Sequence, residues 1–86
     1  MATKVIKFYA DWCGPCRSYT PTFEKVSQEL TEAEFVNLNI DKDTSGLAAE
    51  YKIRSIPTTV VVKEDGTTIK EVGILSEVKL KELILF

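Results

Sequence analysis

The segment FYADWCGPCRS (8–18) contains both cysteines, Cys13 and Cys16, of an 86-residue chain that has no histidine. It overlaps the end of an apolar run, KVIKFYA (4–10), whose β-branched and aromatic residues predict a strand covered on both faces. A glycine and a proline separate the two cysteines and precede a segment of helical periodicity. The pair is therefore expected between a strand and a helix, as a structural disulfide, a metal site or a redox centre.

The helix after the cysteines is predicted from an apolar stripe at spacings of four, three and four residues. The stripe consists of Tyr19, Phe23, Val26 and Leu30. Pro21 lies within it and has no N–H to donate, so we expect a kink there. A second strand is predicted at EFVNLNI (34–40), followed by a short helix over residues 44–51 that Asp41 or Asp43 caps.

The C-terminal part predicts a hairpin and a final helix. TTVVV (58–62) and TIKEVG (68–73) form its strands, with the turn at Asp65-Gly66. Ser76 is expected to cap the helix. Its apolar side is predicted to be Val78, Leu80, Leu83 and Ile84. The order β-α-β-α-β-β-α implies a four-stranded mixed sheet with helices on both faces, in one domain over residues 1–86.

Charge and hydropathy narrow the classes of function. Eleven basic and thirteen acidic residues are interspersed and give a net charge of -2, which argues against nucleic-acid binding. No apolar stretch is long enough to span a membrane. Lys7 interrupts the apolar N-terminal residues, so no signal-peptide core is predicted. We therefore expect a cytoplasmic protein, and in a reducing compartment a close cysteine pair is more often catalytic or metal-binding than structural.

Three roles of the cysteine pair can be compared on physical grounds. A disulfide across so short a loop is worth only about 2 kcal/mol, less than one that closes a wide loop. A structural zinc site typically needs four thiolate or imidazole ligands, and this chain offers two thiolates and no imidazole. A metal site is therefore not expected, and redox chemistry fits the pair best.

The redox interpretation assigns different roles to the two thiols. Cys13 is nearest the predicted helix N-terminus, where free N–H groups and the helix dipole favour the thiolate. Arg17 adds a nearby cation that is expected to tune the thiol pKa. Gly14 and Pro15 allow a sharp turn with little backbone freedom, which keeps Cys16 within reach of Cys13. Cys16, one helical turn further on, is expected to be the more buried thiol.

The motif WCGPC resembles the active site of the thioredoxin family. Three other segments are similar as well: NLNIDKD, YKIRSIPTTVVVKEDG with a cis-proline at Pro57, and EVGILS with a substrate-facing glycine at Gly73. The resemblance covers about residues 4–85. It implies a minimal thioredoxin fold that lacks the additional strand and helix usually found before the segment equivalent to residues 4–10.

The resemblance implies a protein dithiol–disulfide oxidoreductase with Cys13 and Cys16 as catalytic residues. Its implied substrate contacts are Trp12, Gly14, Pro15, Ile56, Pro57 and Gly73. No bound organic cofactor is implied, and a thioredoxin reductase drawing on NADPH would regenerate the dithiol of a monomeric protein. Two alternatives stay open: a glutaredoxin-like protein that uses the glutathione system, and a binding module in which the surface around Trp12 acts without electron transfer.

The sequence departs from the family at Lys7. Thioredoxins usually carry a buried aspartate there, as proton acceptor for the second cysteine, and a lysine at the position of Asn37. One interpretation of Lys7 is that its side chain extends to solvent. The other is that Lys7 is buried beneath the cysteines and tunes the pKa of the thiols. Because buried lysines are rare, the first is favoured.

Overall fold

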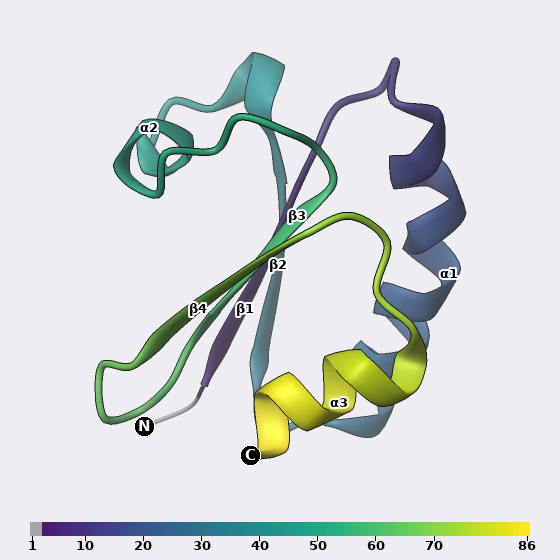
Figure 1. The fold of residues 1–86 in the computed structure, drawn as a ribbon, viewed down its shortest axis with the longest axis vertical. Coiled ribbons are helices and arrows are strands. Elements are labelled where there is room, and N and C mark those ends of the chain that lie inside the picture. Colours follow the sequence, from purple (N-terminus) through teal and green to yellow (C-terminus); the bar gives the residue numbers. More distant parts are fainter. Residues whose placement is uncertain (1–2) are drawn as a thin grey trace.

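The structure is a computed structural model that describes residues 3–86, in which a sheet is covered by helices on both faces (Figure 1). Its elements in chain order are β1 (Lys4–Tyr9), α1 (Gly14–Glu29), β2 (Glu34–Asn39), a 3₁₀ turn (Ile40–Lys42), α2 (Leu47–Glu50), β3 (Thr58–Val62), β4 (Thr68–Val72) and α3 (Glu77–Leu85). The predicted order of strands and helices is confirmed.

The four strands pair in the order β2-β1-β3-β4. β1 is parallel to β2 and antiparallel to β3, and β4 closes the antiparallel hairpin. The predicted turn at Asp65-Gly66 is confirmed, since Gly66 has a φ of 92°, which only glycine adopts readily. In this register Lys7 lies opposite Asn37 on β2 and opposite Thr59 on β3. The mixed sheet predicted from the sequence is therefore present.

The alternation of side chains along β1 explains why both faces of the sheet are covered. On one face Val5 packs with residues of α1 and α3, including Tyr19 and Leu80. On the other face Ile6 and Phe8 are covered by partly buried residues of α2 and its flanking loops. Figure 1 shows α1 and α3 on one side of the sheet and α2 on the opposite side. Consecutive residues of β1 therefore face two different cores.

Helix α1 runs from the cysteine pair along this sheet. It continues through Pro21, and its buried residues include Tyr19, Phe23 and Val26 of the predicted stripe. Leu30 is partly buried at the C-cap. Because this stripe packs onto β1, the N-terminal end of the helix is fixed at the end of that strand.

Two helical predictions need correction. The short helix spans only Leu47–Glu50, because the Asp43 carboxylate accepts backbone N–H groups of Ser45, Gly46 and Ala48 and holds the preceding residues in a loop. In α3 the Ser76 cap is confirmed by a hydrogen bond from the Lys79 N–H. Val78 was predicted on the apolar side of α3, but its side chain is 69% exposed. Only Leu80 and Ile84 of that helix are buried.

Candidate active site

Cys13 is the N-cap residue of α1. Its Sγ accepts a hydrogen bond from the backbone N–H of Cys16 at 3.2 Å, where a serine or aspartate oxygen usually caps a helix. Its own N–H donates to the carbonyl of Ala10 at 3.2 Å, which closes the turn between β1 and α1. An N–H aimed at the sulfur, together with the helix dipole, stabilises negative charge on Cys13 when the thiol is reduced.

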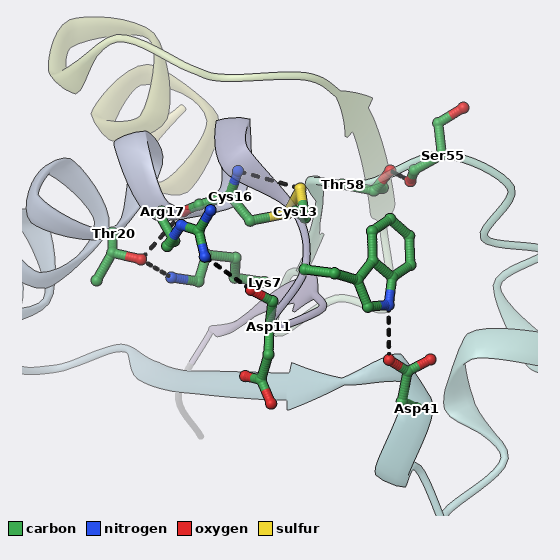
Figure 2. Close-up of a disulfide and its surroundings, with 10 residues drawn as sticks. Lys7, Asp11, Cys13, Cys16, Arg17, Thr20, Asp41, Ser55 and Thr58 are labelled. Carbon is green, nitrogen blue, oxygen red and sulfur yellow. Dashed lines mark hydrogen bonds between the residues drawn. A yellow bond between two sulfur atoms is a disulfide. The ribbon is translucent and has the colours of Figure 1, made fainter.

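The two cysteines form a disulfide with their Cα atoms 5.3 Å apart (Figure 2). Cys13 is 5% exposed and Cys16 is 2% exposed, so Cys16 is the more buried, as predicted. Both belong to a small apolar cluster with Ala10, against which Ile40 and Ile56 pack. Because disulfide exchange requires access to a sulfur, the exposed rim around Cys13 decides which partners reach the site.

The Ile56-Pro57 segment reaches the cysteines from across the sheet. The peptide bond before Pro57 is cis, as expected, and Ile56 packs against the cysteine cluster. The N–H of Gly73 donates to the carbonyl of Pro57 at 2.8 Å. Gly73 has a φ of 99°, which favours glycine. The fold therefore brings together three segments that the sequence indicated separately: residues 12–16, 56–57 and 73.

Trp12 lies on the surface beside the pair and is 67% exposed. Its indole Nε1 donates to the carboxylate of Asp41 at 2.8 Å. The sequence indicated Asp41 only as a helix cap, and the contact with Trp12 was missed because it joins residues 29 positions apart in the chain. This hydrogen bond fixes one edge of an exposed aromatic ring next to the disulfide.

Arg17 is also exposed, and its guanidinium donates to the carbonyl of Asp11 at 3.1 Å. This contact holds the loop that precedes Cys13. Gly14 and Pro15 occupy the exposed first turn of α1 between the two cysteines. A Cβ at Gly14 would meet no atom within 4 Å, so this side of the turn is open to an approaching partner.

Lys7 is buried, and the interpretation in which its side chain extends to solvent is wrong. Its side chain is 3% exposed, and its Nζ donates to Oγ1 of Thr20 on α1 at 3.0 Å. Burial lowers the pKa of Lys7 below its usual value, and the charge of Glu24 opposes that shift. The Lys7 side chain does not reach solvent, because α1 covers the face of β1 on which it lies. Figure 2 shows it next to Thr20 of α1.

Two further observations concern metals and membranes. Residues 3–86 contain no group of three or more histidine, cysteine, aspartate or glutamate side chains arranged to hold a metal ion. Within the same residues, no helix has both the length and the apolar character that crossing a bilayer requires.

Comparison with known proteins identifies the family. The thioredoxin family model matches residues 2–85. Thioredoxin of Mycoplasmoides gallisepticum is 39% identical over 80 residues, which cover 93% of this chain and 79% of that protein. Thioredoxin of Mycoplasma genitalium is 37% identical over 79 residues, covering 92% and 76% respectively.

The solved structures agree with the sequence relatives. The X-ray structure of Fasciola hepatica thioredoxin superposes with a TM-score of 0.85 and 36% identity over 98% of this chain and 79% of that one. Oxidised mitochondrial thioredoxin 3 of Saccharomyces cerevisiae gives a TM-score of 0.82 and 33% identity over 96% and 76%. Because the family model matches residues 2–85 and these relatives are up to 39% identical over most of the chain, this chain belongs to the thioredoxin family, and with its Cys13–Cys16 pair at the N-terminus of α1 it is a thiol–disulfide oxidoreductase.

Proposed function

We propose that this protein reduces disulfide bonds in protein substrates through a mixed-disulfide intermediate. The observation that carries the proposal is the position of Cys13, whose sulfur accepts the Cys16 N–H at the N-terminus of α1. A thiolate is the attacking species in disulfide exchange, and this position favours it. The bond from Trp12 to Asp41 supports the proposal, because it holds an apolar contact surface next to the sulfur.

The reaction has two exchange steps. The Cys13 thiolate attacks one sulfur of the substrate disulfide, a Cys13–substrate bond forms, and the other substrate sulfur leaves as a thiolate that takes up a proton. Cys16 then attacks the sulfur of Cys13 and the second substrate thiol is released. Two electrons pass from the dithiol to the substrate, and the Cys13–Cys16 disulfide is the oxidised product.

Substrate recognition is proposed at the rim of the site. An extended substrate segment would pair with the backbone of Ile56, in the manner of strand addition. Pro57 and Gly73 would lie beneath it, and Gly73 leaves room for its backbone. The remaining proposed contacts, on the α1 side of the site, are Trp12, Gly14 and Pro15. The exposed side chains of Val72 and Ile74 flank Gly73 and extend this apolar surface.

The oxidised protein must be reduced again for turnover. We propose a thioredoxin reductase that draws on NADPH as the electron donor, with the protein acting as a cytoplasmic monomer and without a bound cofactor. A glutathione system is the alternative donor. The Gly-Pro between the cysteines and the neighbouring Trp12 favour the reductase, because this segment resembles the active site of the thioredoxins to which the chain is similar.

The first experiment is reduction of insulin disulfides driven by dithiothreitol, followed by recycling with either donor. We expect the protein to accelerate insulin reduction and to turn over with thioredoxin reductase and NADPH. Turnover with glutathione and glutathione reductase alone would assign the glutaredoxin-like role instead. A folded protein with no acceleration under any donor would contradict the proposed function.

The Trp12–Asp41 hydrogen bond gives a separate prediction about substrate binding. Trp12→Ala should raise KM for insulin by about tenfold, because it removes an exposed aromatic contact worth about 1–2 kcal/mol. Asp41→Ala keeps the Trp12 ring but removes the hydrogen bond that orients it. This variant should raise KM by about two- to threefold with little change in kcat. Asp11→Ala is the matched control, since its carboxylate makes no such contact. Equal KM values in all three variants would contradict a role of Trp12 in binding.

A further inference from the structure

The ammonium of Lys7 is buried without an ion pair to any carboxylate in the part of the chain that the structure describes. Three aromatic rings surround it, with ring centroids 5.5 Å away for Tyr9, 5.9 Å for Tyr19 and 5.1 Å for Phe23. Burying a charge costs free energy, and cation–π contacts with aromatic rings offset only part of the hydration energy that is lost. Such a cation therefore needs an explanation from its surroundings.

A chain of two hydrogen bonds connects Lys7 to the redox pair. Its Nζ donates to Thr20 Oγ1 at 3.0 Å, and the Thr20 hydroxyl donates its single proton to the carbonyl of Cys16 at 3.0 Å. Figure 2 shows Lys7 reaching from β1 toward Thr20 below the turn that holds Cys16. Cys16 and Thr20 are four residues apart, so they share one face of α1. The positive charge therefore lies on the side of the helix that presents the buried cysteine.

The other groups that face Lys7 do not neutralise it. From β2 and β3 its register partners are Asn37 and Thr59, which are both uncharged. The hydroxyl of Tyr19 is engaged with Thr59 at 2.8 Å, and burial raises the pKa of Tyr19, so this phenol stays neutral. From α1, Glu24 contributes the one carboxylate that acts on Lys7, from an exposed position without an ion pair. Positive charge is thus left available to the cysteines.

We propose that Lys7 is a positioning residue of the redox centre, whose buried positive charge, held by Thr20, stabilises the thiolate of Cys16 in the resolving step. The inference rests on the proposed function, because the resolving step belongs to that reaction. An opposite charge near a thiol favours its ionised form, and Thr20 holds the Lys7 ammonium beside the turn of α1 that carries Cys16. Lys7 therefore promotes ionisation of Cys16 electrostatically, and no carboxylate is needed to accept its proton.

The step balances without a further reactant. The Cys16 thiol loses its proton to solvent, and its thiolate attacks Sγ of Cys13 in the mixed disulfide. The bond between Cys13 and the substrate breaks as the Cys13–Cys16 bond forms, and the substrate leaves as a thiolate that takes a proton from solvent. Lys7 keeps its charge throughout. Since the charge favours ionised thiols over the neutral disulfide, it also makes the protein a stronger oxidant.

The test measures thiol ionisation directly, without any protein substrate. In a Cys13→Ser background Cys16 is the single thiol, and the absorbance of its thiolate reports its pKa. Adding Lys7→Met or Lys7→Gln should raise that pKa by about one unit, or about tenfold in the ionisation constant. Lys7→Arg should restore the charge and keep the shift below about threefold. Lys79→Met, at an exposed site on α3, is the matched control and should change nothing.

A second readout is the redox equilibrium with glutathione in the background that keeps both cysteines. At a pH above the Cys16 pKa of each protein, where the reduced state carries the thiolate, Lys7→Met and Lys7→Gln should favour the oxidised protein by about tenfold, which corresponds to a potential about 30 mV more negative. Unchanged Cys16 pKa and unchanged equilibrium in both neutral variants would overturn the proposal, as would a fall of the pKa. Both readouts are independent of insulin reduction. An inactive protein with the predicted shifts would contradict only the proposed function, and an active protein without them would contradict only the role of Lys7.

Discussion

Cys13→Ser is expected to lower insulin reduction by at least about 10³-fold, to the level of dithiothreitol alone. A serine hydroxyl does not ionise near neutral pH, so the Cys16 N–H that now meets Cys13 Sγ would have no thiolate to stabilise. Cys16 is not expected to substitute for the lost thiol, because it is the more buried of the two and lies within α1 rather than at its N-cap. The measurement is the initial rate of insulin reduction at equal protein concentration.

Cys16→Ser should have a different consequence, although its steady-state rate falls as well. Cys13 still attacks the substrate, but the intermediate is not resolved, so a covalent complex with the substrate accumulates. Electrophoresis under non-reducing conditions detects the complex, and dithiothreitol should reduce its mixed disulfide and release the substrate. Ser18→Ala, an exposed change on the same helix, is the control and should keep full activity. Accumulation in Cys13→Ser rather than in Cys16→Ser would show that the roles of the two thiols are reversed.

Most of the fold could be predicted because local signals agreed with each other. The apolar run of β1, the Asp65-Gly66 turn and the Ser76 cap each specify one local geometry, and the structure contains all of them. The prediction that Val78 lies on the apolar side of α3 was wrong, because helical spacing alone does not show how much of the helix surface packs against the core. In α3 that stripe is narrow, since a nine-residue helix packs only Leu80 and Ile84 into the core.

The cysteine pair and its place at the helix N-terminus were predictable from short-range sequence, whereas the surroundings of the pair were not. The contacts from Lys7 to Thr20 and from Trp12 to Asp41 join residues 13 and 29 positions apart, respectively. The burial of Lys7 follows from α1 lying across β1, which no local pattern encodes. Only one signal was available for Thr20: it follows Cys16 by four residues and so shares its helix face.

Lys7→Met is expected to stabilise the oxidised protein by about 1–4 kcal/mol at pH 7. Within residues 3–86 the Lys7 ammonium donates one hydrogen bond and forms no ion pair. Most of the free-energy cost of moving its charge out of water therefore remains uncompensated in the folded state. Methionine has a similar length and would pack among Tyr9, Tyr19 and Phe23, which already line the site. Urea unfolding of the two oxidised proteins measures the difference.

The pH dependence of that difference identifies its cause. Burial lowers the pKa of Lys7 in the folded state, whereas in the unfolded chain it is near 10.5. Between these two pKa values the unfolded state binds more protons, so the stability of the native sequence rises with pH. The advantage of Lys7→Met is therefore complete below the folded pKa, shrinks as pH rises through the window and is smallest above 10.5.

Two comparisons decide whether this explanation of Lys7 holds. Lys79→Met, at an exposed site, should change stability by less than about 0.5 kcal/mol at every pH. If Lys7→Met were destabilising at pH 7, or if its advantage stayed constant up to pH 10.5, the charge would not be costly in the folded state. A stabilising Lys7→Met that also raises the pKa of Cys16 would show that this protein keeps a charge that weakens its core because that charge favours the Cys16 thiolate.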